Sequence, residues 1–445
     1  MSAVGSDQTQ AALLSSIVER IASNSAAITS FLKQNDSPPE LTNKSNPFDV
    51  LVPPNAPEEI RTKQEELLNL ALELQTIATD PYQFLQRQAA QNNQFYCLRW
   101  IFHFNIHANV PQNSAITYAC LASQTGVPER QLTSIARMAI LAGFFSEPEP
   151  GKLAHNRLSA AFAVPSLSDL GSFLTNVSAP MPTKMVEATE KWGGSQSKAH
   201  TAYNVVNDTE LPIFEHTAGI PELREQYAQY MKNQAATEGL SPMHLVRGFD
   251  WASLGDVTVI DVGGSLGHAS AALAAEFPEL NFVVQDLPAT VEKARSLSPT
   301  LFSPSVLERI SYQEHDFFQP QPQPSGRKPD VFLLRMILHD WKDDDAAKIL
   351  KNLASAMGPK VRNKHEPRMI IMDIVMPDAA GSISRVQEMQ LRVRDLTMLQ
   401  AHNARERELR DWYALIDSAD CGLVLRNHVR PFNSILSIME VAIKE

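Results

Sequence analysis

The C-terminal part of this sequence alternates apolar runs of strand length with runs of helix length, and this alternation constrains the fold more than any other feature. The runs of strand length occupy residues 257–262, 282–286, 331–334, 369–375, 423–425 and 438–441. Helical segments, including 269–276 and 344–357, lie between them. Strands that alternate with helices form a mainly parallel sheet with helices on both faces. We therefore expect a doubly wound α/β domain from about residue 256 onward.

The sequence before residue 256 has helical periodicity instead. Apolar residues recur at helical spacing from about residue 8 to 34, and a polar segment rich in Pro and Asn, residues 34–57, follows as a predicted linker. A second helix is expected to begin near Pro57 and to end before Asp80-Pro81, because the residue before a proline disfavours the helical conformation.

These patterns divide the 445 residues into three expected parts. Residues 1–57 form a variable N-terminal helix and linker, and residues 58–175 form a helical domain. Residues 176–445 form the α/β domain, and their first part, 176–250, is a helical segment that we expect to line a substrate pocket. Apolar candidates for lining that pocket are Trp192, Phe214, Met231 and Met336.

Residues 114–160 follow the order of a winged helix: a helix, a turn, a second helix and two short strands. Such units often bind DNA through the second helix. Here that helix, 129–142, has only two arginines, and the chain has 39 Lys and Arg against 50 Asp and Glu, a net charge of −11. Because DNA binding needs clustered cations, we expect a structural or dimerisation role and no nucleic-acid partner.

An apolar and aromatic run at residues 95–102 covers several sides of a predicted helix. A helix that is apolar nearly all round is buried either in a large core or against a partner. Both interpretations, burial within one chain and a helical dimerisation layer, are open.

No segment reaches the roughly 18 apolar residues that a membrane span needs, and the N-terminus lacks the basic and apolar regions of a targeting signal. The three scattered cysteines are too few for a disulfide framework or a zinc site. We therefore expect a cytoplasmic protein without a membrane partner.

A glycine-rich turn follows the first strand of the α/β part. The segment Asp-Val-Gly-Gly-Ser-Leu-Gly, residues 261–267, comes directly after the strand and opens a helix. Glycines let the backbone approach a ligand closely, and open α/β sheets bind ligands at the carboxyl ends of their strands. The spacing of the glycines departs from the complete dinucleotide-binding pattern.

Acidic residues extend this candidate site. Asp286 ends the second strand, where a carboxylate can accept hydrogen bonds from ribose hydroxyls. Asp316 is a candidate acceptor for the amine of adenine, with Phe317 packing on the ring. A glycine turn with spaced acids indicates a nucleoside site without a phosphate clamp, which argues against NAD and its pyrophosphate.

His339 is the candidate general base. It lies in Leu-His-Asp-Trp, residues 338–341, at the carboxyl end of a strand beside the nucleoside site. The ordinary pKa of histidine, close to neutrality, suits proton transfer. Asp373 ends the following strand on the same edge, and Glu406 lies in a loop before the next helix. A carboxylate bonded to one ring nitrogen would fix the tautomer and stabilise the imidazolium.

In combination, these residues resemble the class I S-adenosylmethionine-dependent O-methyltransferases of the plant and fungal caffeate type, and are most similar to those that modify fungal polyketides. The resemblance covers roughly residues 60–445. Its specific part is the Leu-His-Asp-Trp segment at this distance from the glycine turn. The family implies a Rossmann-like catalytic domain and an N-terminal helical, winged-helix domain that forms a homodimer.

The resemblance also implies how S-adenosylmethionine is held. Gly263 and Gly264 pass under the methionine part of the cofactor, and Asp286 holds the ribose. The adenine is framed by Asp316 and Phe317. In addition, Arg335 occupies a basic position of the family, four residues before the histidine.

The implied reaction is methylation of an aromatic or polyketide hydroxyl. His339 removes the proton of a phenol as its oxygen attacks the methyl group, and Asp373 and Glu406 flank the histidine. The displacement is in line at carbon and needs no metal.

Two other functions fit parts of the sequence. Some relatives of these methyltransferases keep the cofactor but catalyse pericyclic or other non-methylating steps, and they tend to replace the base, whereas His339 and both acidic neighbours are present here. A DNA-binding regulator built on the winged helix is disfavoured by the acidic charge and by the intact catalytic set.

Overall fold

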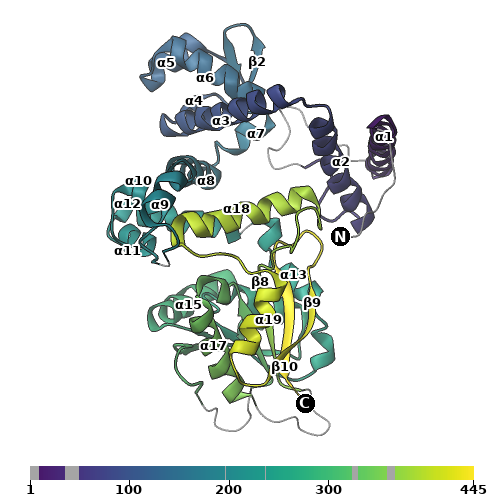
Figure 1. Ribbon diagram of the computed structural model, residues 1–445, viewed down its shortest axis with the longest axis vertical. Coiled ribbons are helices and arrows are strands. Elements are labelled where there is room, and N and C mark those ends of the chain that lie inside the picture. Colours follow the sequence, from purple (N-terminus) through teal and green to yellow (C-terminus); the bar gives the residue numbers. More distant parts are fainter. Residues whose placement is uncertain are drawn as a thin grey trace. The chain divides into compact units, whose positions relative to one another are not determined.

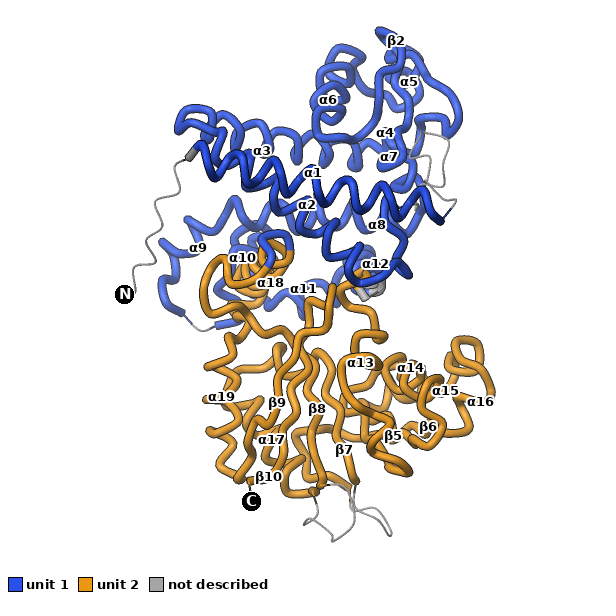
Figure 2. Tube along the Cα trace, turned by 90° about the vertical axis from the view of Figure 1, so that its right-hand side faces the viewer, with its two compact units in different colours: residues 1–233, 384–386 blue, residues 234–383, 387–445 orange. Residues whose placement is uncertain are grey.

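The computed structural model describes residues 10–35, 50–195, 197–235, 237–322, 329–357 and 366–444. The chain forms two compact units (Figure 2): unit 1 is Met1–Asn233 with Ser384–Val386, and unit 2 is Gln234–Ile383 with Gln387–Glu445. Most of the predicted linker, 34–57, lies outside the described residues. The units are divided by their internal contacts, whereas the expected boundaries at 57 and 175 divide the chain by the expected role of each part. These boundaries therefore stay predictions.

Unit 1 is mainly helical. Its helices are α1 (Gln10–Gln34), α2 (Glu58–Ile77), α3 (Pro81–His103), α4 (Ile106–Asn109), α5 (Tyr118–Thr125), α6 (Glu129–Leu141), α7 (Arg157–Ala161), α8 (Pro165–Phe173), the π-helix η1 (Leu174–Ser178), the 3-10 turn η2 (Pro182–Lys184), α9 (Met185–Trp192), α10 (Ala202–Asn207), α11 (Ile213–Ala218) and α12 (Pro221–Ala235), whose last two residues belong to unit 2. Its strands are β1 (Ile116–Thr117), β2 (Ser146–Glu149) and β3 (Lys152–Ala154).

The winged-helix order predicted for residues 114–160 is present. Helices α5 and α6 are followed by the hairpin of β2 and β3, and β1 completes a three-stranded sheet in the order β1-β3-β2. Arg137 of α6 donates to both carboxylate oxygens of Glu147 in β2, at 3.0 and 2.9 Å. One of the two arginines of this helix is therefore engaged within the fold.

Helix α3 contains the apolar run at 95–102. Asp80 caps its N-terminus, and Ile101 and Phe102 are buried in a core shared with α5 and α6. Phe95 remains 42% exposed. Burial within one chain therefore accounts for the end of the run, and dimerisation concerns only the exposed side chains.

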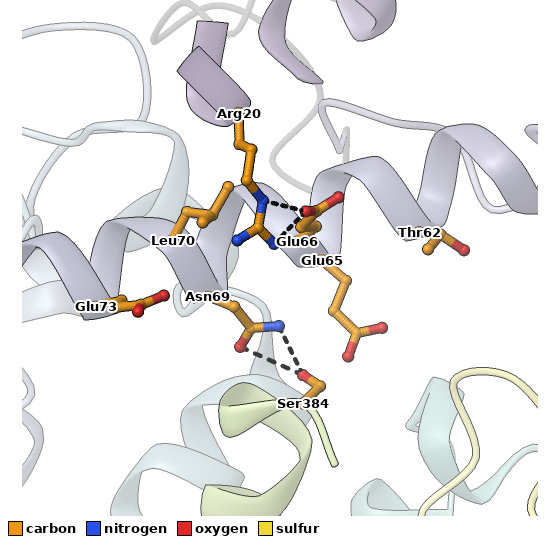
Figure 3. Close-up of a pocket in the computed structure, with 8 residues that line it drawn as sticks. All are labelled: Arg20, Thr62, Glu65, Glu66, Asn69, Leu70, Glu73 and Ser384. Atoms are coloured by element: carbon orange, nitrogen blue, oxygen red, sulfur yellow. Dashed lines mark hydrogen bonds and ion pairs between the residues drawn. The ribbon is translucent and has the colours of Figure 1, made fainter. Parts of the chain in front are cut away.

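The short segment Ser384–Val386 is tied to helix α2 (Figure 3). The side chain of Asn69 donates to Oγ of Ser384 at 3.0 Å and accepts from the amide of Val386 at 3.1 Å. Arg20 of α1 donates to Glu66 of α2 at 2.6 Å in the same pocket. Arg20 and Glu66, two charged residues that line this pocket, therefore form an ion pair with each other.

Unit 2 contains the α/β domain (Figure 1). Its strands are β4 (Thr258–Val262), β5 (Asn281–Asp286), β6 (Ile310–Glu314), β7 (Val331–Arg335), β8 (Arg368–Asp373), β9 (Leu423–Val429) and β10 (Ser437–Ile443). Its helices are the 3-10 turn η3 (Glu238–Leu240), α13 (Met243–Gly248), the 3-10 turn η4 (Ala252–Leu254), α14 (His268–Glu276), α15 (Pro288–Leu301), α16 (Pro304–Leu307), the 3-10 turn η5 (Leu338–Asp340), α17 (Asp343–Ala356), α18 (Arg385–His402), which begins in unit 1, and α19 (Leu409–Ser418).

The strands of unit 2 form a seven-stranded sheet in the order β6-β5-β4-β7-β8-β10-β9. The first five are parallel, and β10 runs antiparallel to both β8 and β9. This confirms the doubly wound, mainly parallel sheet. The strands expected from the sequence did not include β6. This strand lies at the edge of the sheet, and its sequence Ile-Ser-Tyr-Gln-Glu has only one strongly apolar residue, so it gives no apolar run.

Both faces of this sheet are covered, because successive side chains of a strand point to opposite faces. Val259 and Leu333 pack with residues of α13 and α14 on one face. Ile260 and Phe332 pack with residues of α17 and α19 on the other. Near-continuous apolar runs are therefore the pattern expected of these strands. None of the helices within the described ranges combines the length and the apolar character needed to cross a membrane.

Candidate active site

The candidate residues of unit 2 gather where the parallel strands end. Asp286 is the last residue of β5, Arg335 of β7 and Asp373 of β8. The glycine turn follows β4, and Asp316 follows β6. Because the five strands are parallel, these positions share one edge of the sheet, the edge at which open α/β sheets bind ligands.

The two glycines of the turn have no room for side chains. Gly263 has φ +66°, and a Cβ there would lie 2.6 Å from Cδ1 of Ile337. A Cβ on Gly264 would lie 2.5 Å from the carboxylate carbon of Asp261. The amide of Gly264 donates to the carbonyl of Gln285 at 3.1 Å, which fixes the turn against β5.

The carboxylate below this turn, Asp261, was not among the predicted site residues, although it begins the motif. It is 1% exposed and accepts a hydrogen bond of 2.6 Å from Oγ of Ser270 in α14. Burial raises the pKa of Asp261 to about 6, while the Ser270 bond and the charge of Arg335 oppose this rise. The turn is thus supported by an ionisable group in the core.

Asp286 is also bound to the turn. Its Oδ2 accepts from the amide of Ser265 at 2.9 Å, and its Oδ1 accepts from the amide of Leu287 at 2.8 Å. A carboxylate has about four acceptor positions, so further acceptor capacity remains for a ligand.

Asp316 and Phe317 lie on the loop after β6. Oδ1 of Asp316 accepts from the amide of Phe318 at 2.9 Å, which shapes the loop. The ring of Phe317 contacts Trp341 edge-on, with centroids 5.8 Å apart, and one of its atoms lies 3.6 Å from the Cβ position of Gly263. The aromatic side chain therefore borders the glycine turn.

Arg335 is largely engaged inside the protein. Its Nη2 donates to the carbonyl of Leu240, and its Nε is buried without a hydrogen-bond partner among the described residues. Burial lowers the pKa of the Arg335 guanidinium, and the carboxylates of Asp261 and Asp373 oppose this effect. The guanidinium thus balances two buried acids, and its part in holding a cofactor stays a prediction.

The structure brings His339, Asp373 and Glu406 together. Nδ1 of His339 lies 3.4 Å from Oε1 of Glu406, and the backbone amide of His339 donates to Oδ2 of Asp373 at 3.3 Å. Asp373 is 0% and Glu406 5% exposed, and Oε2 of Glu406 has no hydrogen-bond partner in the described chain. Two buried carboxylates therefore surround one imidazole.

The electrostatics of this group favour the imidazolium. Burial lowers the pKa of His339, but the charges of Asp373, Glu406 and Asp340 outweigh burial and raise it to about 10. Burial raises the pKa of Asp373 to about 6, although the charge of His339 opposes the rise. The site is thus built to stabilise a positive charge on the ring.

The same three side chains have the donor types of a metal site. One ligand atom from each of His339, Asp373 and Glu406 lies within 4.8 Å of the others. A divalent transition metal accepts this donor set, whereas an oriented base uses it without a metal. The expectation of a metal-free reaction stays a prediction.

The four pocket candidates lie in different units. Met336 belongs to unit 2, and Trp192, Phe214 and Met231 belong to unit 1. Phe214 and Met231 are 51% and 45% exposed. Their place in an acceptor pocket stays a prediction.

Comparison with known proteins gives a consistent result. A family model described as an O-methyltransferase domain matches residues 195–421. The O-methyltransferase VdtC of Byssochlamys spectabilis is 41% identical over 432 residues, which are 96% of this chain and 97% of VdtC.

Solved structures share the fold at low sequence identity. The crystal structure of OxaC in complex with SAH and oxaline is 20% identical, with a TM-score of 0.70 over 98% of this chain and 100% of that one. A structure titled "A Pericyclic Reaction enzyme" is also 20% identical, with a TM-score of 0.68 over 96% of this chain and 100% of that one. The fold alone therefore does not separate methylation from a pericyclic reaction.

Proposed function

This chain belongs to the O-methyltransferase family, and from that membership we propose that it methylates a phenolic hydroxyl of an aromatic or polyketide secondary metabolite, with His339 as the general base. The cofactor is S-adenosylmethionine, which supplies an electrophilic methyl group on a positively charged sulfur. The observation that carries the proposal is the grouping of His339 with two buried carboxylates beside the glycine turn.

The strand ends fit this cofactor. Gly263, at φ +66°, and Gly264 form a turn without side chains at the strand end, and glycines let the backbone lie close to a ligand. Asp286 keeps acceptor capacity for the ribose hydroxyls after its two backbone bonds. Phe317 borders the turn, where an aromatic ring can pack on adenine.

His339 moves the proton through Nε2. Its Nδ1 is directed toward Glu406, and its Nε2 lies 3.6 Å from Oδ1 of the exposed Asp340 side chain, so Nε2 is the nitrogen that we assign to the acceptor hydroxyl. As the phenol loses its proton, the ring becomes an imidazolium between two carboxylates. General base catalysis of this kind contributes about 10² to 10⁴-fold to the rate, and alignment of the reacting atoms contributes the rest.

The enzyme acts as a homodimer in this proposal, through its N-terminal helical domain. Helix α3 has exposed apolar residues at Tyr82, Leu85 and Phe95, which are 83%, 68% and 42% exposed in the single chain. Contiguous exposed apolar side chains are typical of a surface that a partner covers, and we assign these three to the dimer interface. Size-exclusion chromatography with light scattering tests the dimer, and a monomeric mass at micromolar concentration would contradict it.

The activity is tested with purified protein, S-adenosylmethionine and a panel of phenolic polyketides. Mass spectrometry then measures both the acceptor and S-adenosylhomocysteine. A gain of one methyl group with an equal amount of S-adenosylhomocysteine supports the proposal. An acceptor that rearranges at constant mass, with the cofactor unconsumed, would instead support a pericyclic reaction.

A further inference from the structure

We propose that Arg407 is a positioning residue that holds the backbone turn of His339 against the segment of Glu406, and so sets the geometry of the base. The proposal rests on the proposed function of His339. Arg407 was not among the residues that the sequence indicated, and no part of the reaction described above uses it.

The contacts of Arg407 converge on one turn. Its Nη1 donates to the carbonyl of Leu338 at 2.7 Å, and its Nη2 donates to the carbonyl of Trp341 at 2.7 Å. These carbonyls lie immediately before His339 and two residues after it. The guanidinium therefore spans the turn from one side to the other.

The guanidinium adds to a weakly bonded turn. The turn η5 is a single 3-10 turn, Leu338–Asp340, and the carbonyl of Leu338 accepts one bond within it, from the amide of Trp341 at 3.3 Å. A carbonyl has a second acceptor position, and the shorter bond from Arg407 fills it. Leu338 is 0% and Arg407 is 4% exposed, so water does not readily replace the guanidinium.

Arg407 also belongs to the backbone segment that carries Glu406, the carboxylate beside His339. Arg407 directly follows Glu406, and its backbone carbonyl accepts from the amide of Met376 at 2.8 Å. The amide of Glu406 donates to Asp395 at 2.9 Å. The backbone that presents the Glu406 carboxylate and the backbone that presents His339 are thus connected through one side chain.

The remaining contacts of Arg407 fix the plane of its guanidinium. Nε and Nη2 donate to Oδ1 of Asp343, at 2.9 and 2.8 Å, and the guanidinium carbon lies 5.3 Å from the ring centroid of Trp412. A lysine ammonium carries the same charge but cannot present this planar set of donors. The arrangement therefore requires an arginine rather than a positive charge alone.

The test compares Arg407→Lys and Arg407→Ala with Arg410→Gln as a matched control. Arg410 lies on the same segment, but its side chain is 77% exposed and pairs with Glu408. Steady-state kinetics give kcat and its pH profile, and calorimetry gives the affinity for S-adenosylmethionine. Folding is checked by circular dichroism and thermal unfolding.

We expect both Arg407 variants to lose kcat by about 10²-fold, because small displacements of a catalytic group have effects of this size. Their cofactor affinity should stay within about threefold of wild type, since only the reacting geometry changes. The acid limb of the pH profile should also move, because the distance between His339 and Glu406 changes. Guanidinium at millimolar concentration should partly restore Arg407→Ala, whereas Arg407→Lys should not respond.

Asp343→Asn serves as a second variant if the Arg407 variants do not fold. The Asp343 side chain is 62% exposed, so its replacement leaves the core intact while it removes one charge partner of Arg407. A lower kcat with unchanged cofactor affinity supports the proposal. An unchanged kcat in this variant, or Arg407 variants that fold and match Arg410→Gln, overturns it.

Failure of the proposed function gives a different result. If the wild-type protein transfers no methyl group, or if His339→Gln is as active as wild type, the assignment of the base fails. If the wild type is active and His339→Gln is not, the Arg407 variants test the positioning role alone.

Discussion

Replacing Glu406 by glutamine removes one of the two buried charges around His339 while it keeps a side chain of the same shape. His339 and Glu406 are close together and buried: Nδ1 of His339 lies 3.4 Å from Oε1 of Glu406, and the two side chains are 11% and 2% exposed. At this distance and an effective dielectric constant of about 20, the gross attraction is about 5 kcal/mol.

Part of that attraction offsets the burial of the charges, so the net effect on the pKa of His339 is smaller. An opposite charge at such a distance changes a pKa by about 1 to 3 pH units. The carboxylates outweigh burial and raise the pKa of His339 to about 10. Glu406→Gln should therefore lower the pKa of His339, because it removes one of the charges that raise it and leaves only Asp373 and Asp340.

The assay is kcat/KM against pH, because its acid limb reports the free enzyme's essential base. In the wild type, kcat/KM should rise with pH through neutrality, since the base must lose its proton. In Glu406→Gln the limb should lie about 1 to 3 pH units lower, with a lower maximum because the imidazolium is less stabilised. Glu408→Gln, two residues further along, should leave the limb in place. A limb of Glu406→Gln that stays in place or moves to higher pH would show that Glu406 does not raise the pKa of the essential base.

Three further predictions follow from other parts of the structure. Asp286→Ala should weaken binding of S-adenosylmethionine by about 10-fold or more, because a lost hydrogen bond to a charged group costs about 1.5–3 kcal/mol; an unchanged affinity in calorimetry would exclude the ribose role. Burial lowers the pKa of His107 to about 4. The unfolded chain then binds the proton first, so stability is present above the ordinary pKa of about 6.5 and is lost as the pH falls toward 4, by about 3 kcal/mol at most. Urea unfolding should show this fall in the wild type and a smaller fall in His107→Gln; equal falls in both would contradict it. A chelator should leave turnover unchanged, and a loss that added metal reverses would show that the His339 group holds an ion.

The parts of the fold that the sequence could predict are those with local signals. The strand before the glycine turn is almost wholly buried, and its position directly before Gly263 and Gly264 predicted the edge of the sheet at which we expect the ligand. Strand β6 was missed because an edge strand of this sheet is largely polar.

The proposed catalytic residues also show that local signals reach only part of the site. His339 and Asp373 each follow or end a strand, so their approach follows from parallel topology. The contacts of Arg407 with Leu338 and Trp341 join residues 69 and 66 positions apart, and no spacing in the sequence indicates them. The sequence alone shows only that Arg407 directly follows Glu406.

Methyl transfer by His339 as the base can be measured with S-adenosylmethionine that carries an isotopically labelled methyl group, in wild type and His339→Gln side by side. The wild type should place the label on a phenolic oxygen and form an equal amount of S-adenosylhomocysteine. His339→Gln should bind the cofactor as well as wild type but lose about 10²-fold or more of the turnover. Label transfer at an undiminished rate by His339→Gln would exclude His339 as the base, and conversion of the acceptor without any label would exclude methyl transfer.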